Sequence, residues 1–304
     1  MLKISVAWAA FTAVSLGAAA TLGADNASVE TAPVAQAEAP IKPASVTLAN
    51  SETFRITSQH TGGEHLIKVA YPRNYHQTGK RYPVVYATDA ETNFGAMQYV
   101  VQRLAKDKLM PEVILVGIAY DVDYDTFYKL RERDLRPAWD ESFGASPEQA
   151  AKTKGKAHKF SAFLREELIP QVDAKFRTIE GDRAVYGHSY GGLYGTYAFL
   201  YQSDLFNRYL ILSPSLWWPW DENRENILVD SAASLDLPER DARVFMGSGE
   251  LEGQIDTLQM KFVDRIRPNL DPSVKLHAEV YNNETHRTIY GRGVMDGFRY
   301  LYKE

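Results

Sequence analysis

A glycine-bounded serine near the middle of the chain constrains the fold more than any other feature. Residues 183–192 read RAVYGHSYGG, so an apolar run ends at Gly187, Ser189 follows two residues later, and small residues then open a helix-like stretch. A serine hydroxyl becomes a useful nucleophile only where a sharp turn presents it to a base and to a backbone N–H. Side chains at Gly187 and Gly191 would collide with the neighbouring strand and helix in that turn. The stretch therefore predicts a strand, a strained turn that carries a nucleophilic Ser189, and a helix.

The N-terminal residues have the composition of a targeting segment followed by a tether. A basic residue precedes an apolar run at residues 4–20, which is typical of a secretory signal peptide. We predict that residues 1–24 are this signal, cleaved after Ala20 or Ala24; an uncleaved anchor is the alternative, although the run is short for a membrane span. Residues 25–45 are rich in Ala, Pro, Glu and Val without periodicity, which predicts a disordered tether. The expected location is periplasmic or secreted, with no stable membrane span after cleavage.

The remaining residues, 46–304, have the length of one α/β domain. The sequence has no cysteine, which excludes disulfides, a lipid-anchored cysteine, a thiol nucleophile and cysteine-ligated zinc. The net charge of −5 and the pI near 5.9 give no general attraction to nucleic acid or to anionic lipid. Any positively charged binding site must therefore be local.

Short apolar runs alternate with helical stretches through this domain. Besides the run before Ser189, strands are expected at residues 53–60, 65–71, 82–87, 113–119, 208–212, 241–246 and 275–281. Besides the stretch after Ser189, helices are expected at residues 96–109, 160–176, 254–266 and 291–302. The first two strands predict an antiparallel hairpin, whereas strands that are apolar on both faces belong inside a parallel sheet covered by helices. The pattern predicts a mixed, mainly parallel sheet flanked by helices, with active groups beyond the carboxyl ends of the strands.

The chain offers seven histidines as a base for Ser189. His286 alone follows the last predicted strand, in the loop NNETHR at residues 282–287. Hydrolases with a serine between a strand and a helix run serine, acid, histidine along the chain, and this order favours His286 as the base. A solvated loop histidine is the alternative interpretation.

The third catalytic residue should be a carboxylate after the predicted strand at 241–246. The loop that follows contains Glu250 and Glu252, and Asp256 comes shortly after. We favour Glu252, whose carboxylate would hold the tautomer of the imidazole and stabilise the imidazolium. Glu250 and Asp256 remain rival acids.

Two backbone N–H groups should stabilise the oxyanion that forms in the transition state, each by about 3 kcal/mol. One is the N–H of Tyr190, directly after the nucleophile. The other should come from the turn after the predicted strand at 82–87, near Asp89, Ala90 and Glu91, and we assign it to Ala90.

An acidic run has the spacing of a calcium loop but lacks its central glycine. Asp121, Asp123 and Asp125 are followed by Glu132, while the sixth position is Thr126. That loop needs glycine for its sharp turn, so we expect a polar loop and no metal site. The chemistry expected at Ser189 requires no cofactor.

Basic and aromatic side chains gather after two predicted strands. The basic residues are Lys129, Arg131, Arg133 and Arg136, and the indoles are Trp217, Trp218 and Trp220. The basic residues either form a solvated charge run or line a pocket for an anionic substrate, and we assign Arg131 and Arg133 to substrate binding. Trp217 and Trp218 are as consistent with a pocket wall for aromatic groups as with core, and we assign them to the substrate site.

Several motifs, taken together, resemble the putative-esterase family of α/β-hydrolases. They are GHSYGGL at 187–193, SPSLWW at 213–218, the loop at 249–252, YPVVY at 82–86 and RxxDxxP at 131–137. The resemblance covers residues 53–302 and implies the α/β-hydrolase fold. The family includes esterase D-like enzymes, feruloyl esterases, mycolyltransferases and siderophore esterases. The chain looks most similar to the periplasmic enzymes that open trilactone catecholate siderophores such as enterobactin and salmochelin.

This resemblance implies a serine esterase whose partner is a small-molecule ester, here a ferric catecholate siderophore that is cleaved for iron release. Ser189 would attack the ester carbonyl with His286 as base, and water would then release the acyl-enzyme. Some siderophore esterases work with a Ser/His dyad, so the resemblance leaves open that Glu252 is dispensable. A feruloyl- or small-acyl-ester hydrolase or acyltransferase of the same family is one alternative. A non-catalytic binding protein with this fold is the alternative from another class.

Overall fold

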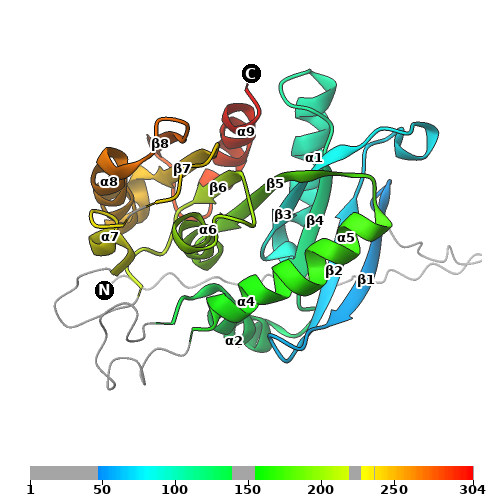
Figure 1. The fold of residues 1–304 in the computed structure, drawn as a ribbon, viewed down its shortest axis with the longest axis horizontal. Helices are drawn as coiled ribbons and strands as arrows, with labels where there is room; N and C mark the ends of the chain where they lie inside the picture. The colour runs from blue at the N-terminus through cyan, green and yellow to red at the C-terminus, as the bar shows by residue number, and fades with distance from the viewer. Residues whose placement is uncertain (1–46, 139–154, 219–226, 236, 304) are drawn as a thin grey trace, which may run out of the picture. The chain divides into compact units, whose positions relative to one another are not determined.

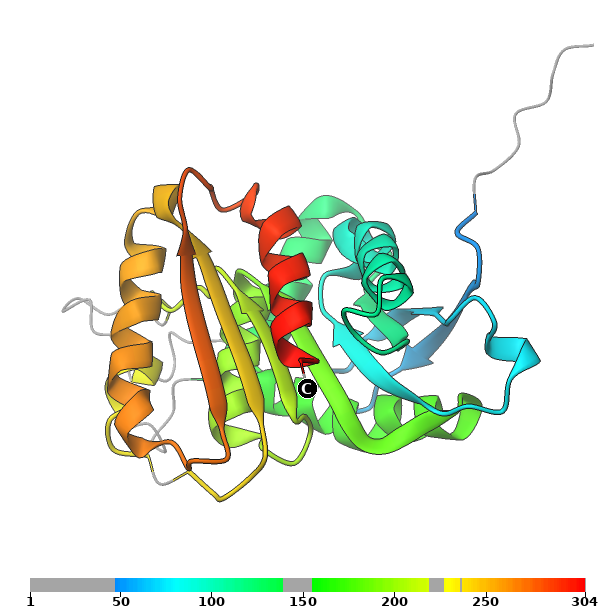
Figure 2. The same ribbon diagram turned by 90° about the horizontal axis from the view of Figure 1, so that it is seen from above.

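A single sheet organises the computed structural model, which describes residues 47–138, 155–218, 227–235 and 237–303 (Figures 1 and 2). In these residues the sheet has eight strands, in the order β1-β2-β4-β3-β5-β6-β7-β8. The predicted signal peptide and tether, as well as Trp220, lie outside the described residues.

The strands pair as the alternation of the sequence predicts. Their bounds are β1 Ser51–Thr57, β2 Glu64–Ala70, β3 Tyr82–Ala87, β4 Ile114–Ala119, β5 Thr178–His188, β6 Arg208–Leu212, β7 Arg243–Gly249 and β8 Lys275–Tyr281. β1 and β2 form the expected antiparallel hairpin, and β2 pairs antiparallel with β4. All further pairs, from β4 and β3 through to β7 and β8, are parallel. The prediction of a mixed, mainly parallel sheet is confirmed.

Helices cover both faces of the sheet. Their bounds are α1 Ala90–Lys106, α2 Tyr124–Leu135, α4 Ala157–Phe163, α5 Ile169–Lys175, α6 Tyr190–Tyr201, α7 Ile227–Ser231, α8 Gln254–Ile266 and α9 Ile289–Leu301. α1 and α9 pack side by side on one face, where Figure 2 shows them above the strands. α4, α5, α6, α7 and α8 contribute to the core on the opposite face. Every residue of β3 and β4 is buried, as a covered parallel sheet requires.

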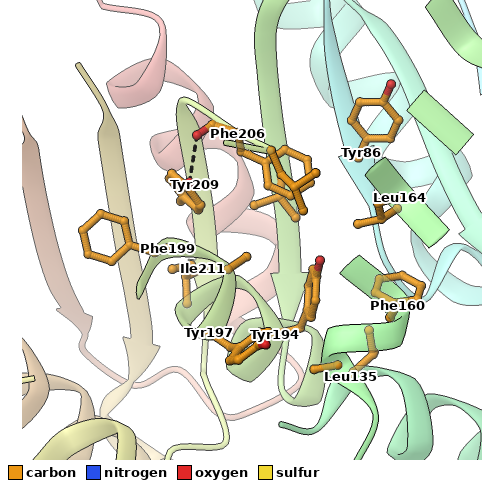
Figure 3. Packing of buried hydrophobic residues seen from close by; sticks show 14 of the residues in the cluster. Tyr86, Leu135, Phe160, Leu164, Tyr194, Tyr197, Phe199, Phe206, Tyr209 and Ile211 are labelled. Carbon is orange, nitrogen blue, oxygen red and sulfur yellow. Dashed lines mark hydrogen bonds between the residues drawn. The ribbon is translucent and has the colours of Figure 1, made fainter. Parts of the chain in front are cut away.

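The core beneath α6 is rich in aromatic side chains (Figure 3). The rings of Phe160 and Tyr194 meet edge to face, with centroids 5.0 Å apart, and the Tyr194 hydroxyl hydrogen-bonds Ser161 Oγ at 3.0 Å. The Tyr209 hydroxyl donates to the carbonyl oxygen of Phe206 at 2.8 Å. α6 is therefore fixed on both sides, by the sheet and by α4, and this rigid helix carries the turn with Ser189 at its N-terminus.

Several elements differ from the expectations. α1 begins at Ala90, six residues before the predicted start, because Ala90, Asn93 and Phe94 of its first turns are buried beside the sheet. A five-residue π-helical turn, Leu164–Leu168, divides the helix predicted at 160–176 into α4 and α5. The sequence did not predict α2, whose buried face includes Arg131 and Asp134 and so lacks an apolar periodicity. Within the described ranges, no helix has the length and apolar character of a membrane span.

Candidate active site

Ser189 lies at the junction of β5 and α6, in a strained backbone conformation. Its φ of 61° and ψ of −116° are rare for a residue with a side chain. Its backbone N–H donates to the carbonyl oxygen of Leu212 at 3.1 Å, and its carbonyl oxygen accepts from the N–H of Leu193 at 2.9 Å. These bonds, one to the neighbouring strand and one to the first turn of α6, hold the serine at the carboxyl edge of the sheet.

The glycines around Ser189 are required by space. A Cβ atom at Gly187 would fall on the carbonyl group of Gly191, and one at Gly191 would fall on Thr88 Oγ1. A Cβ atom at Gly192 would lie 2.6 Å from the carbonyl oxygen of Leu212. The predicted strand, tight turn and helix are confirmed, and the glycines have the steric role that the motif suggested.

His286 reaches this turn from the loop after β8. Its Nδ1 lies 2.7 Å from Glu252 Oε2, and its ring centroid lies 4.5 Å from that of His188, the residue before Ser189. The hydrogen bond to Glu252 fixes Nδ1 as the protonated nitrogen of the neutral ring, which leaves Nε2 free to accept a proton. The structure therefore joins His286 to Glu252 and places the His286 ring against that of His188, the residue before the strained serine.

Glu252 has the environment of an ionised, oriented acid. Its side chain is fully buried. Oε1 accepts a hydrogen bond from Ser213 Oγ at 2.8 Å and another from the N–H of Gly249. Burial alone would raise the pKa of Glu252, but the hydrogen bonds from His286, Gly249 and Ser213 outweigh it and hold the pKa below its ordinary value.

The two rival carboxylates point elsewhere. Glu250 is exposed and its Oε2 accepts from the N–H of Asn283 at 3.1 Å. Asp256 accepts from the N–H of Thr257 at 2.7 Å, in the first turn of α8. Among the three candidates, Glu252 alone is hydrogen-bonded to His286.

His188 is closer to Ser189 in the chain than His286 is, but its environment disfavours a role as the base. Burial, together with the charge of His286, lowers the pKa of His188 to about 4, although Asp89, Glu252 and a backbone hydrogen bond with His286 act in the opposite direction. A base with so low a pKa has little affinity for the proton of a serine hydroxyl. His286, held by Glu252, is better suited to that step.

The loop after β6 contributes two serines to the site that we did not predict from the sequence. Ser213 has a φ of 44° and donates to Glu252, while Ser215 Oγ lies 3.4 Å from Ser189 Oγ. The N–H of Ser215 also donates to the carbonyl oxygen of Ser189 at 3.1 Å. Their position directly after a predicted strand could have indicated this role. β5 and β6 are parallel neighbours, so residues that follow them lie at the same edge of the sheet.

The turn between β3 and α1 packs directly against the serine turn. Asp89 has a left-handed φ of 57°, and its Oδ2 would lie 3.3 Å from a Cβ atom at Gly191. Ala90, the predicted second oxyanion donor, is the first residue of α1 and is fully buried. The elements that carry the N–H groups of Tyr190 and Ala90 are therefore adjacent, as an oxyanion hole requires.

The two arginines assigned to substrate binding are both engaged by carboxylates. Arg131 is buried and donates from Nε and Nη2 to the two carboxylate oxygens of Asp89, each at 2.8 Å. Arg133 donates from Nε to Asp134 at 2.6 Å, with about a quarter of its side chain exposed. We predicted that Arg131 faces the substrate. In the structure its guanidinium is instead buried and bonded to the carboxylate of Asp89.

Trp217 and Trp218 lie next to Tyr190 and Arg136. The rings of Trp217 and Tyr190 have centroids 5.9 Å apart. The Arg136 guanidinium lies 4.1 Å from the ring centroid of Trp218 and 5.6 Å from that of Tyr190. Both indoles are half-buried and pack against the core, as the core interpretation requires, and their assignment to the substrate site stays a prediction.

A basic cavity of about 660 Å³ adjoins this aromatic group. The described residues that line it are Lys129, Glu132, Arg133, Arg136, Gly155, Lys156, His158 and Lys159. Glu132 Oε1 accepts a hydrogen bond from the Tyr190 hydroxyl at 3.5 Å, which connects the cavity to the residue after the nucleophile. The volume is in the range of small-molecule sites. Five lysines and arginines against one glutamate favour an anionic ligand.

The acidic run near α2 has structural roles. Asp123 caps α2 by accepting from the N–H of Thr126 at 3.0 Å, and Asp121 pairs with Arg55. The parts of the chain that the structure describes contain no group of three His, Asp or Glu side chains placed to hold a metal ion.

Comparison with known proteins places this fold and site in a family. A model of the family described as Putative esterase matches residues 58–291. The chain is 32% identical, over 58% of its own length and 60% of the relative, to the siderophore triacetylfusarinine C esterase of Aspergillus fumigatus. It is 30% identical to the ferri-bacillibactin esterase BesA of Bacillus subtilis, over 56% of this chain and 60% of that one. The chain thus spans about 60% of the length of these curated relatives.

A solved structure extends the likeness to three dimensions. The IroE-like serine hydrolase of Shewanella oneidensis superposes with a TM-score of 0.69 and 26% identity, covering 83% of this chain and 80% of that one. The eight-stranded, mainly parallel sheet and its neighbours among solved esterases identify the fold as that of an α/β-hydrolase. With a family match over most of its length and the strained serine, histidine and buried glutamate at the edge of this sheet, the chain belongs to the Putative esterase family of α/β-hydrolases.

Proposed function

We propose that the protein is a serine esterase in which Ser189, His286 and Glu252 form a catalytic triad. The observation that carries this proposal is the 2.7 Å contact between His286 Nδ1 and the buried Glu252 carboxylate, with the His286 ring packed against His188, the residue before a serine in a strained turn. The roles follow from the chemistry of the groups. No step of this reaction needs a cofactor.

The reaction proceeds in two acyl transfers. Ser189 Oγ attacks the ester carbonyl while His286 Nε2 takes the hydroxyl proton, and Glu252 stabilises the resulting imidazolium. The tetrahedral oxyanion accepts hydrogen bonds from the N–H groups of Tyr190 and Ala90. The imidazolium then protonates the leaving alkoxide, and an acyl-enzyme forms on Ser189. Water, deprotonated by His286, attacks the acyl group and releases the carboxylic acid.

We further propose a siderophore ester as the substrate, in the form of a catecholate trilactone such as enterobactin or its ferric complex. Two observations support this proposal. Several relatives that match this chain by sequence carry names of siderophore esterases. The basic cavity beside Tyr190, Trp217 and Trp218 suits a ligand that is both anionic and aromatic. Iron release by hydrolysis of the ligand would fit the periplasmic or secreted location that the N-terminal residues predict.

Mass spectrometry of ferric and iron-free enterobactin, incubated with the protein and with Ser189→Ala, tests both levels of the proposal. We expect linear trimer, dimer or monomer with the wild type and intact trilactone with the variant. Survival of enterobactin together with Ser189-dependent cleavage of a feruloyl or simple aryl ester would refute the siderophore substrate and retain the esterase. An intact trilactone, no cleavage of any ester and no labelling by a fluorophosphonate would indicate a non-catalytic binding protein.

A further inference from the structure

The buried ion pair between Asp89 and Arg131 joins three elements at the active site. We propose that it is a positioning device, which holds the two predicted oxyanion donors, the N–H groups of Ala90 and Tyr190, in register with each other. This inference rests on the proposed esterase function. In this inference Arg131 positions the two N–H groups and does not contact the substrate.

Asp89 occupies an unusual place for a helix N-cap. It precedes Ala90, the first residue of α1, and has a φ of 57° and a ψ of 39°. Aspartate at an N-cap normally accepts a hydrogen bond from the first turn of its helix, but the Asp89 side chain makes no such bond. Its carboxylate is turned away from α1 and toward α2. A left-handed residue depends on its surrounding contacts, so the partner of this carboxylate helps to restrain the shape of the turn.

That partner is Arg131, on the buried face of α2. Its Nε donates to Asp89 Oδ1 and its Nη2 to Asp89 Oδ2, both at 2.8 Å. The side chains are 8% and 10% exposed. Two parallel bonds between a planar guanidinium and a planar carboxylate restrain orientation as well as distance. The pair therefore restrains the position of the β3–α1 turn relative to α2.

The same pair touches the serine turn. A Cβ atom built on Gly191 would lie only 3.3 Å from Asp89 Oδ2. The Arg131 guanidinium lies 5.1 Å from the ring centroid of Tyr190. Asp89 immediately precedes one predicted donor residue, Ala90, and Tyr190 is the other. A shift of this pair would change the distance between the two N–H groups on which the oxyanion depends.

Other contacts also hold the turn, but they join it to elements other than α2. Lys68 Nζ donates to the carbonyl oxygen of Ala90 at 3.0 Å, and Asn93 Nδ2 donates to that of Thr88 at 2.9 Å. These bonds join the turn to β2 and to α1, and the N–H of Thr88 joins it to β5 by donating to the carbonyl oxygen of Tyr186 at 3.2 Å. Arg131 lies outside the described lining of the basic cavity, which also argues against a role as a substrate ligand.

Steady-state kinetics with a neutral aryl ester test the proposal in Arg131→Lys and Asp89→Asn. Lysine at position 131 keeps the charge but cannot form two parallel bonds. Asparagine at position 89 keeps the size of the side chain, and this variant serves as the test if Arg131→Lys folds poorly. Arg165→Lys is the matched control, because Arg165 makes the same two-point contact with Asp204, at 2.6 and 2.8 Å, beyond the C-terminal end of α6. Active sites are counted by fluorophosphonate titration, and the affinity for an aryl boronic acid reports binding of a tetrahedral anion.

We expect kcat per titrated site to fall about 30- to 100-fold in both variants, while KM stays within about twofold of the wild type. The affinity for the boronic acid should fall by about the same factor as kcat. The control should match the wild type. A rise in KM at unchanged kcat would make Arg131 a substrate ligand and overturn the proposal. Lower thermal stability with unchanged kcat per titrated site would make the pair purely structural and also overturn it. A wild type that hydrolyses no ester would instead refute the esterase function itself, before any variant is compared.

Discussion

Three carboxylates lie within seven residues after β7, and their surroundings separate them. Glu252 is buried and bonded to His286, whereas Glu250 and Asp256 bond to backbone N–H groups at the surface. The difference could not be obtained from residue type or spacing, since all three positions are compatible with the expected order along the chain. The direction of each side chain after the turn at Gly249 decides among them. The loop after β8 shapes this turn, because the carbonyl group of Glu284 occupies the place of a Cβ atom on Gly249.

We predict that Glu252→Gln lowers kcat about 10²- to 10⁴-fold, or roughly 3 to 5 kcal/mol of transition-state stabilisation. The amide keeps the size of the side chain but cannot stabilise the imidazolium of His286. Kinetics with an aryl ester, in which Glu250→Gln and Asp256→Asn serve as isosteric controls, measure the effect. A loss of less than about tenfold in Glu252→Gln would mean that Ser189 and His286 act as a dyad.

At the same scale, Ser189 and His286 were predictable because chain order and local motif restrict them strongly. The pairing of Arg131 with Asp89 was not, since 42 residues separate them. An arginine after a strand is equally compatible with a pocket wall and with a buried ion pair. Only the packing of α2 distinguishes these two possibilities.

Among the elements, β2 carries a buried histidine with a consequence for acid stability. His65 is fully buried, its ring stacks on Phe163 with centroids 4.3 Å apart, and its Nε2 is hydrogen-bonded to Thr61 Oγ1 at 2.8 Å. Burial, together with the nearby positive charge of Arg133, lowers the pKa of His65 to about 4, from an ordinary value of 6.5. The fold therefore favours the neutral ring.

A lowered pKa makes the contribution of His65 fully present above pH 6.5 and progressively lost as the pH falls toward 4. We predict that the free energy of unfolding of the wild type decreases, between pH 7 and pH 5, by about 2 kcal/mol more than that of His65→Gln. Urea unfolding at the two pH values checks this difference. Equal pH dependence in the wild type and His65→Gln would contradict the assignment.

The elements with simple apolar patterns were predicted well, and the exceptions have physical causes. β3 and β4 are buried on both faces, so their apolar runs are unambiguous. α2 buries Arg131 and Asp134; Asp89, distant in the sequence, compensates the charge of Arg131, and the adjacent Arg133 compensates that of Asp134. A helix whose inner face carries paired charges has no recognisable apolar stripe, and its prediction requires knowledge of those partners.

For the molecule as a whole, a net charge of −5 coexists with a strongly basic cavity beside the candidate site. Net charge therefore excluded a general affinity for polyanions but did not exclude a local anionic site. A concave surface with one sign of charge concentrates the field over the cavity, while the remaining surface repels anions.

We predict that Lys129→Gln combined with Lys159→Gln raises KM for ferric enterobactin about fivefold or more and leaves KM for a neutral aryl ester within about twofold. Both side chains are exposed and line the cavity, so their removal should change attraction rather than folding. Lys80→Gln combined with Lys261→Gln removes the same charge from exposed positions elsewhere and is the control. If both pairs have equal effects, the cavity does not bind the anionic substrate.

The sequence by itself determined the alternation of strands and helices, the strained serine turn and the histidine that follows the last strand. These features depend on local sterics, on burial patterns and on order along the chain, all of which are written in short segments. The tertiary structure alone decided which glutamate bonds His286, that Ser213 and Ser215 reach the site, and that Asp89 holds Arg131. These contacts join residues from different strand ends. Their geometry arises only when the parallel sheet brings those ends to one edge.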